Sequence, residues 1–145
     1  MKEVAGDIWG YYEQGCWIVI PTNGYVKKNG ACVMGRGLAK QAADRFPYIP
    51  FIIGRGIRQL GNGPQVITDY RIVTFPVKHN WWENADIQLI ESSCKKLVEL
   101  VNKVGWGEIC IPRVGCGNGR LNWRDVKPVL EKYLDDRFIV VEKSG

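Results

Sequence analysis

Two glycine-rich segments carry the groups with which this chain could hold a phosphorylated ligand. The first spans residues 23–42 and contains Gly30, Gly35 and Gly37, and the second spans residues 115–119 with three glycines in five positions. Glycine lets a backbone approach a ligand closely, and successive unpaired N–H groups form a binding site for anions. Either segment alone could be a plain turn, but the pair predicts a diphosphate site.

Positive charge within the first segment strengthens this prediction. The cationic side chains are Lys27, Lys28, Arg36 and Lys40. A helical pattern follows from Leu38, and a helix N-terminus favours phosphate. Neither segment contains the Gly-Lys-Ser/Thr run of a P-loop, which disfavours a nucleoside triphosphatase.

Four further side chains have useful chemistry but lack a clear partner in the sequence. His79 is suited to acid–base catalysis, but nothing in the sequence positions it. Cys116 invites interpretation as a nucleophile, although no histidine is evidently paired with it and its small size is enough to explain its place. Trp81 and Trp82 could cover a ribose or stack on a nucleobase, or they could simply pack at an edge.

Alternating strands and helices must position these groups. Apolar runs predict strands at residues 2–4, 17–21, 65–68, 71–77, 108–111 and 138–141, with a turn at residues 6–8. Helical spacing predicts one helix that ends near residue 46, helices at 50–60 and 85–104, and a last one that begins no earlier than about Arg124 because of Pro128. This order is typical of an α/β fold with a mostly parallel sheet between helical layers. Ligands bind such sheets beyond the carboxyl ends of the strands, so both glycine segments are expected to meet at one crevice.

The length, composition and net charge of the chain limit the class of protein. The 145 residues fit one domain, and 46% hydrophobic residues are enough for a full core. The net charge of +5 favours an anionic partner. Five scattered cysteines and one histidine make a metal site unlikely and suggest a reducing compartment. We expect a cytoplasmic protein, because no run approaches the length of a membrane span.

The order of four motifs resembles that of the macrodomain family. They are Gly6-Asp7-Ile8, Asn23 after a buried strand, the run from Val33 to Ala39, and the run from Pro112 to Gly117. The resemblance covers almost the whole chain. It implies a three-layer α/β/α macrodomain-like fold over residues 1–145, with ADP-ribose or an ADP-ribosylated substrate as partner and with no cofactor, metal or membrane.

Three runs resemble one branch of this family: residues 34–37, residues 72–78 and residues 115–123. The branch contains macrodomain antitoxins that remove ADP-ribose from DNA and the terminal ADP-ribose protein glycohydrolase. It also contains small phage and bacterial proteins labelled as ADP-ribose-1″-phosphate processing. ADP-ribosylated DNA is therefore among the partners that the resemblance implies.

The resemblance also assigns roles to residues. Asp7 and Ile8 would contact adenine, Asn23 would bind the distal ribose, and Lys78 would lie beside the anomeric carbon. There the lysine could act as a nucleophile if burial or nearby cations lower its pKa, and the alternative is an ordinary solvent-exposed lysine at a strand end. Asn23 and Lys78 would be the reactive pair. The implied ADP-ribose-binding residues are Asp7, Ile8, Asn23, Gly30, Val33, Met34, Gly35, Arg36, Gly37, Leu38, Gly115, Cys116, Gly117, Asn118 and Gly119.

One departure from the branch bears on the substrate. The terminal ADP-ribose protein glycohydrolase has a necessary aspartate where this chain has Gly119, whereas the DNA-directed antitoxins also have glycine. The leading hypothesis is therefore an ADP-ribosyl hydrolase that acts on nucleic acid or protein. The alternatives are an ADP-ribose-1″-phosphate phosphatase, a non-catalytic ADP-ribose reader and, on charge alone, a nucleic-acid binding protein.

Overall fold

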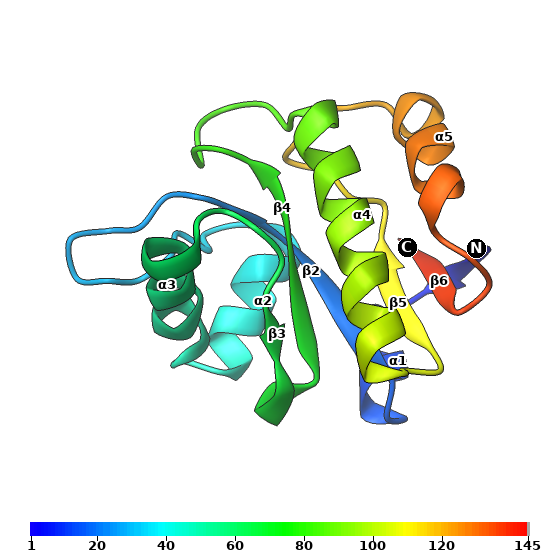
Figure 1. Ribbon diagram of the computed structural model, residues 1–145, viewed down its shortest axis with the longest axis horizontal. Helices are drawn as coiled ribbons and strands as arrows, with labels where there is room; N and C mark the ends of the chain where they lie inside the picture. Colours follow the sequence, from blue (N-terminus) through cyan, green and yellow to red (C-terminus); the bar gives the residue numbers. More distant parts are fainter. Residues whose placement is uncertain (145) are drawn as a thin grey trace.

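A six-stranded sheet in the order β1-β6-β5-β2-β4-β3 forms the centre of the protein in the computed structural model, which describes residues 1–144 (Figure 1). Neighbouring strands are parallel except β3 and β4, which are antiparallel. The predicted α/β class and mostly parallel mixed sheet are thus confirmed. The strands are β1 (Lys2–Gly6), β2 (Trp17–Asn23), β3 (Val66–Ile67), β4 (Ile72–Lys78), β5 (Ile109–Pro112) and β6 (Phe138–Lys143).

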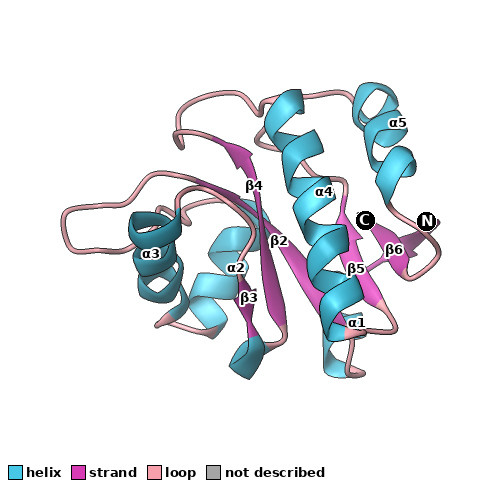
Figure 2. Ribbon diagram, viewed as in Figure 1, coloured by secondary structure: helices cyan, strands magenta, loops and turns pink. Residues whose placement is uncertain are grey.

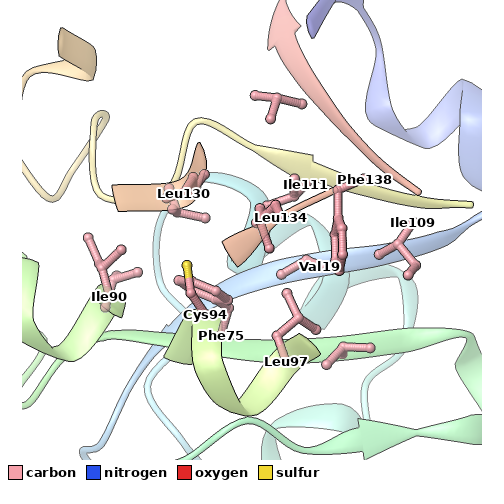
Figure 3. Close-up of a cluster of buried hydrophobic side chains, with 14 of the residues drawn as sticks. Val19, Phe75, Ile90, Cys94, Leu97, Ile109, Ile111, Leu130, Leu134 and Phe138 are labelled. Carbon is pink, nitrogen blue, oxygen red and sulfur yellow. The ribbon is translucent and has the colours of Figure 1, made fainter. Parts of the chain in front are cut away.

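Helices cover both faces of this sheet (Figure 2). Alternate residues of a strand point to opposite faces, so each strand supplies two cores. Ile18 and Ile20 of β2 belong to the core under α1, α2 and α3. Val19 belongs to the core under α4 and α5, and Figure 3 shows this second core. The three layers are therefore α/β/α, as predicted. The helices are α1 (Ile8–Glu13), α2 (Gly37–Arg45), α3 (Ile49–Leu60), α4 (Ile87–Val104) and α5 (Trp123–Tyr133).

The structure corrects the sequence analysis in the first helix. Residues 6–8 were expected to form only a turn, but α1 begins at Ile8. Asp7 is its N-cap, and the Asp7 Oδ1 accepts a hydrogen bond from the Trp9 amide at 3.1 Å. The helix has six residues and includes Gly10 and two tyrosines, so its intrinsic propensity and periodicity are both weak. Burial of Ile8 and Trp9 against the sheet stabilises it instead.

Two other boundaries differ by a small number of residues. Helix α5 begins at Trp123, one residue before the predicted limit, and it contains Pro128. The strand predicted at residues 65–68 is shorter, because Thr68–Tyr70 form a 3₁₀ turn. Neither difference moves the glycine loops away from the ends of their strands. Across residues 1–144, no helix is long and apolar enough to cross a membrane.

Candidate functional site

A cleft of about 1630 Å³ lies at the carboxyl ends of the parallel strands. Its walls include the last residues of β2, β4, β5 and β6, together with parts of the loops that follow β2 and β5. Strand β2 is central, with β4 on one side and β5 on the other, so the loops after these strands diverge around a crevice. The predicted convergence of the two glycine segments is confirmed. Every residue that the family resemblance assigned to the ADP-ribose site lines this cleft, with the exception of Gly30.

Gly30 instead shapes the first loop, which we define as residues 24–36. Its amide donates to the Lys27 carbonyl at 2.9 Å, and its φ of 92° lies in the left-handed region. Its carbonyl oxygen packs so tightly on α3 that a Cβ on Gly54 would lie 2.0 Å from it. Gly30 therefore does not line the cleft, and its role in this structure is to form a turn and pack against a helix.

The end of the first loop presents unpaired backbone donors to the cleft. The amides of Gly35, Arg36 and Gly37 donate to no acceptor among residues 1–144. Gly35 and Gly37 are exposed, and Gly37 begins helix α2 with a φ of 59°. Because α2 begins here, its dipole adds a partial positive charge to the same place. This geometry suits an anionic group.

The second loop, residues 113–122, also presents unpaired backbone amides to the cleft. The amides of Gly117, Asn118 and Gly119 also donate to no acceptor among the described residues. The two loops approach each other, since a Cβ on Gly37 would lie 3.3 Å from the Asn118 side-chain nitrogen. Two sets of free amides that face one cleft can hold two adjacent phosphates.

Gly119 holds the second loop in place. Its carbonyl accepts a hydrogen bond from the Ala85 amide at 2.9 Å, just before α4. A Cβ at position 119 would lie 2.5 Å from the Gly115 oxygen and 2.8 Å from the Ala85 Cβ. The loop therefore has no room for a side chain at this position, whereas a Cβ on Gly117 would meet nothing within 4 Å.

Asn23 and Lys78 lie side by side at the ends of β2 and β4. They are register partners, after a local irregularity between Thr22 and Asn23. The Asn23 side chain is buried and held by the first loop: its Nδ2 donates to the Val33 carbonyl and its Oδ1 accepts from the Tyr25 amide, each at 2.9 Å. One N–H of Nδ2 remains available to a ligand.

The environment of Lys78 destabilises the charged form of its amine. Burial lowers its pKa below the ordinary value of 10.5, and the charges of Arg36 and Arg120 lower it further. The Nζ atom donates to the Trp81 carbonyl at 3.4 Å, so the amine stays close to the cleft wall. In the same region, Asn62 Nδ2 donates to the Lys78 carbonyl at 3.0 Å and fixes the end of β4. The condition for a nucleophilic lysine, a lowered pKa, is met here.

The opposite end of the cleft is formed around Asp7 and Ile8. Capping of α1 uses the Asp7 Oδ1, which leaves Oδ2 without a donor among residues 1–144. The Ile8 side chain is buried and apolar. A free carboxylate oxygen beside an apolar surface can bind the amino edge of a flat heterocycle.

His79 and Cys116 do not form part of a catalytic group. The His79 Nε2 lies 2.9 Å from the Asp86 Oδ2, and Asp86 caps α4, so the histidine is held outside the cleft lining. Hydrogen bonding to His79 lowers the Asp86 pKa. Burial raises the pKa of the Cys116 thiol, which donates to the Val114 carbonyl at 3.5 Å. Cys116 is thus a protonated, space-filling residue.

The sequence analysis missed several residues at the cleft. Arg120 influences the Lys78 amine and has a φ of 65°, and Tyr25 and Arg113 line the walls. The position of Arg120 directly after the second glycine segment was an available signal. Nothing in the sequence indicated that Arg113 would pair with Glu142 of β6 at 3.1 Å.

Six basic and three acidic side chains line the cleft, so its charge is positive. The basic ones are Lys27, Arg36, Arg45, Lys78, Arg113 and Lys143, and the acidic ones are Asp7, Asp44 and Glu142. Within residues 1–144, no three His, Cys, Asp or Glu side chains gather in a way that could hold a metal ion.

Known proteins resemble this chain in sequence and in fold. The Macro domain family model matches residues 62–130. A DNA ADP-ribosyl glycohydrolase from Thermus aquaticus is 32% identical over 117 residues, which cover 74% of this chain and 32% of the relative. The chain spans about a third of the length of the curated relatives that it matches.

Solved structures agree with this similarity. Thermosipho africanus DarTG in complex with ADP-ribose has a TM-score of 0.79 and 25% identity, covering 98% of this chain and 41% of that one. The macrodomain of Mycobacterium tuberculosis DarG has a TM-score of 0.81 and 22% identity, covering 99% of this chain and 97% of that one. The second similarity extends over nearly the full length of both chains, so the fold is the same.

Proposed function

Since this chain has the fold and the motifs of a macrodomain, we propose that it binds ADP-ribose in the cleft and hydrolyses a linkage that joins ADP-ribose to a macromolecule. The observation that carries the proposal is the placement of Lys78. Its amine has a lowered pKa and lies beside Asn23, at a cleft with two sets of free amides.

The proposed ligand matches the cleft from end to end. Adenine lies at Asp7 and Ile8, the diphosphate lies between the two loops, and the distal ribose lies at Asn23 and Lys78. Each part meets a group with complementary chemistry: a carboxylate oxygen and apolar surface for adenine, backbone amides for the phosphates, and an amide donor for a ribose hydroxyl.

In the proposed reaction, the unprotonated form of the Lys78 amine is the nucleophile. Lys78 Nζ attacks the anomeric carbon, a C–N bond forms, and the bond from that carbon to the macromolecule breaks. The leaving group takes the bonding electron pair and the proton that the nitrogen loses. Water then attacks the same carbon and the C–N bond breaks, with its electron pair and one proton of the water going to the nitrogen. This step releases ADP-ribose and restores the lysine. Asn23 orients the ribose through the N–H of Nδ2 that the first loop does not use.

DNA is the substrate that we favour. The relative from Thermus aquaticus is named a DNA ADP-ribosyl glycohydrolase. Gly119 also stands where the protein-directed enzyme of the branch has an aspartate, and the tight contacts of Gly119 leave no space for that side chain. A phosphatase acting on ADP-ribose-1″-phosphate is the second candidate, because Arg36 and Arg120 lie near Lys78 and would attract a terminal phosphate.

A panel of substrates tests this proposal. The same preparation is offered ADP-ribosylated DNA, ADP-ribosylated protein and ADP-ribose-1″-phosphate, and the release of ADP-ribose or phosphate is followed. We expect turnover on DNA to exceed that on the other two. Phosphate release alone would establish the phosphatase, and binding of ADP-ribose without turnover of any substrate would establish a reader.

A further inference from the structure

Three large aromatic side chains form an exposed group, which we call the aromatic rim: Tyr25, Trp81 and Trp82. Their exposed fractions are 37%, 47% and 60%. Indole and phenol rings bury most of their area when they serve only the core, so a contiguous exposed group of this kind indicates a binding surface.

The aromatic rim lies at the reactive end of the cleft. Tyr25 and Trp81 line the cleft, and the Lys78 Nζ donates to the Trp81 carbonyl at 3.4 Å. The Tyr25 amide donates to the Asn23 Oδ1 at 2.9 Å. Both members of the reactive pair are thus directly connected to the rim. The proposed function places the anomeric carbon at Asn23 and Lys78, so the group attached to that carbon leaves the cleft at this end.

The rings of the rim meet edge to face and do not stack on one another. Trp81 and Trp82 meet edge to face, with centroids 5.6 Å apart and an angle of 89° between the planes. Tyr25 and Trp82 meet at 5.6 Å and 68°. In edge-to-face pairs one ring face stays uncovered, and an uncovered ring face can take a stacked base.

The charges nearby suit a phosphodiester strand. Lys27 lines the cleft from the first loop, and Arg36 and Arg120 lie close enough to Lys78 to lower its pKa. The acidic groups of this region are already engaged: Glu83 accepts from the Asn80 amide at 2.7 Å, and Asp86 pairs with His79. The region around the rim therefore combines free cations with free aromatic faces, which is the combination that binds single strands.

We propose that the aromatic rim stacks on the nucleobases that flank the ADP-ribosylated nucleotide. This inference rests on the proposed function and adds a specificity determinant to it. The rim makes an oligonucleotide a better substrate than a mononucleoside, and it requires flanking bases that are unpaired. Stacking needs no base-edge contact, so the flanking sequence matters little.

The test compares substrate lengths in variants of one rim residue. Trp82→Ala removes a ring that is 60% exposed and lies outside the cleft lining. We expect its kcat/KM for an ADP-ribosylated single-stranded oligonucleotide to fall about tenfold further than its kcat/KM for the ADP-ribosylated mononucleoside, given the usual contribution of one stacked base. Trp82→Phe keeps a ring and should recover most of the loss. The control is Tyr48→Ala, at an exposed aromatic (73%) away from the cleft, which should change neither value.

Two outcomes would overturn the inference. If Trp82→Ala lowered kcat/KM equally for the oligonucleotide and the mononucleoside, Trp82 would act through the fold or through Lys78. If it lowered kcat/KM for an ADP-ribosylated peptide as much as for the oligonucleotide, the surface would not be selective for bases. If the wild type cleaves none of these substrates, the proposed function fails. Fluorescence anisotropy with the ADP-ribosylated oligonucleotide and with ADP-ribose then still decides the inference, because only the affinity for the oligonucleotide should fall in Trp82→Ala.

Discussion

The lowered pKa of Lys78 is caused by its surroundings in the folded protein. A lysine at a strand end is usually a fully charged group in water, but burial and two arginines destabilise the charged form here. The same lysine is the register partner of Asn23, a buried amide that the first loop holds rigidly. A reactive amine and a positioning amide therefore share one end of the cleft.

Substitution of Lys78 should separate chemistry from binding. Lys78→Ala should leave the affinity for ADP-ribose within about 1 kcal/mol, because one partly exposed charge contributes little to binding. Turnover should fall on the order of a hundredfold or more, since the nucleophile is lost. Calorimetry and an ADP-ribose release assay measure the two effects, and Lys96→Ala on the exposed face of α4 is the control. Full activity of Lys78→Ala would refute the lysine mechanism.

Arg120 should set the pH dependence. The neutral amine of Lys78 reacts, so kcat/KM should rise as pH passes through the lowered pKa. Arg120→Asn removes one of the charges that lower this pKa, and asparagine tolerates the φ of 65°. The pKa should then rise, and the ascending limb of the pH profile should move to higher pH. Arg120→Lys keeps the charge and should leave the limb in place. An unmoved limb in Arg120→Asn would mean that another group is titrating.

Asp7 has two separable roles. Asp7→Ala should weaken ADP-ribose binding by about 1–3 kcal/mol through the lost acceptor. It should also destabilise the protein by roughly 1 kcal/mol, because Asp7 caps α1. Asp7→Asn keeps the cap and should reduce only the binding. Titration calorimetry with thermal unfolding distinguishes the two losses, and undiminished binding in both variants would remove Asp7 from the adenine site.

At the scale of elements, the two glycine loops determine what the cleft can hold. Each follows a parallel strand, and each leaves three amides without an acceptor among residues 1–144. The glycines within them are not equivalent. Gly117 faces open space, whereas Gly119 is enclosed by the Gly115 carbonyl and the Ala85 side chain.

This difference yields a paired prediction. Gly117→Glu should abolish ADP-ribose binding and leave the fold intact, because it adds bulk and negative charge in open space beside the diphosphate. Gly119→Ala should lower the midpoint of thermal unfolding, because its Cβ would overlap backbone atoms. Circular dichroism and calorimetry on both variants test this. Normal ADP-ribose binding by Gly117→Glu would mean that the second loop does not hold the diphosphate.

At the scale of the whole molecule, the cleft draws its residues from nearly the full length of the chain. Residues from Gly6 to Ser144 line it, and the sheet order brings the ends of β2, β4, β5 and β6 to one edge. Its volume of about 1630 Å³ exceeds the roughly 300–1,000 Å³ that is usual for small-ligand pockets. The extra space suits a ligand that remains attached to a macromolecule.

Chelation should leave this protein active. The proposed mechanism uses an amine and backbone amides, and the described residues hold no cluster of metal-binding side chains. Treatment with EDTA followed by gel filtration should therefore not change turnover of ADP-ribosylated DNA. A loss that Mg²⁺ or Mn²⁺ restores would contradict the mechanism.

The sequence by itself determined the fold class and the convergence of the two glycine loops on one cleft. Apolar runs separated by helical patterns are enough to predict α/β layers, because both periodicities are local. Glycine segments at strand ends were enough to predict a shared crevice, because parallel strands end at the same edge. Short helix α1 was missed, since its stability comes from burying Ile8 and Trp9 and not from its own propensity.

Only the tertiary structure decided which residues act together. Asn23 and Lys78 are 55 positions apart in sequence, and the pairing of β2 with β4 makes them neighbours. Gly30 looked like part of the cradle, but its packing on α3 places it outside the cleft. The lowered pKa of Lys78 depends on Arg36 and Arg120, which belong to two different loops. Distances between chain segments and the burial of charge are properties of the folded molecule, so no local pattern could reveal them.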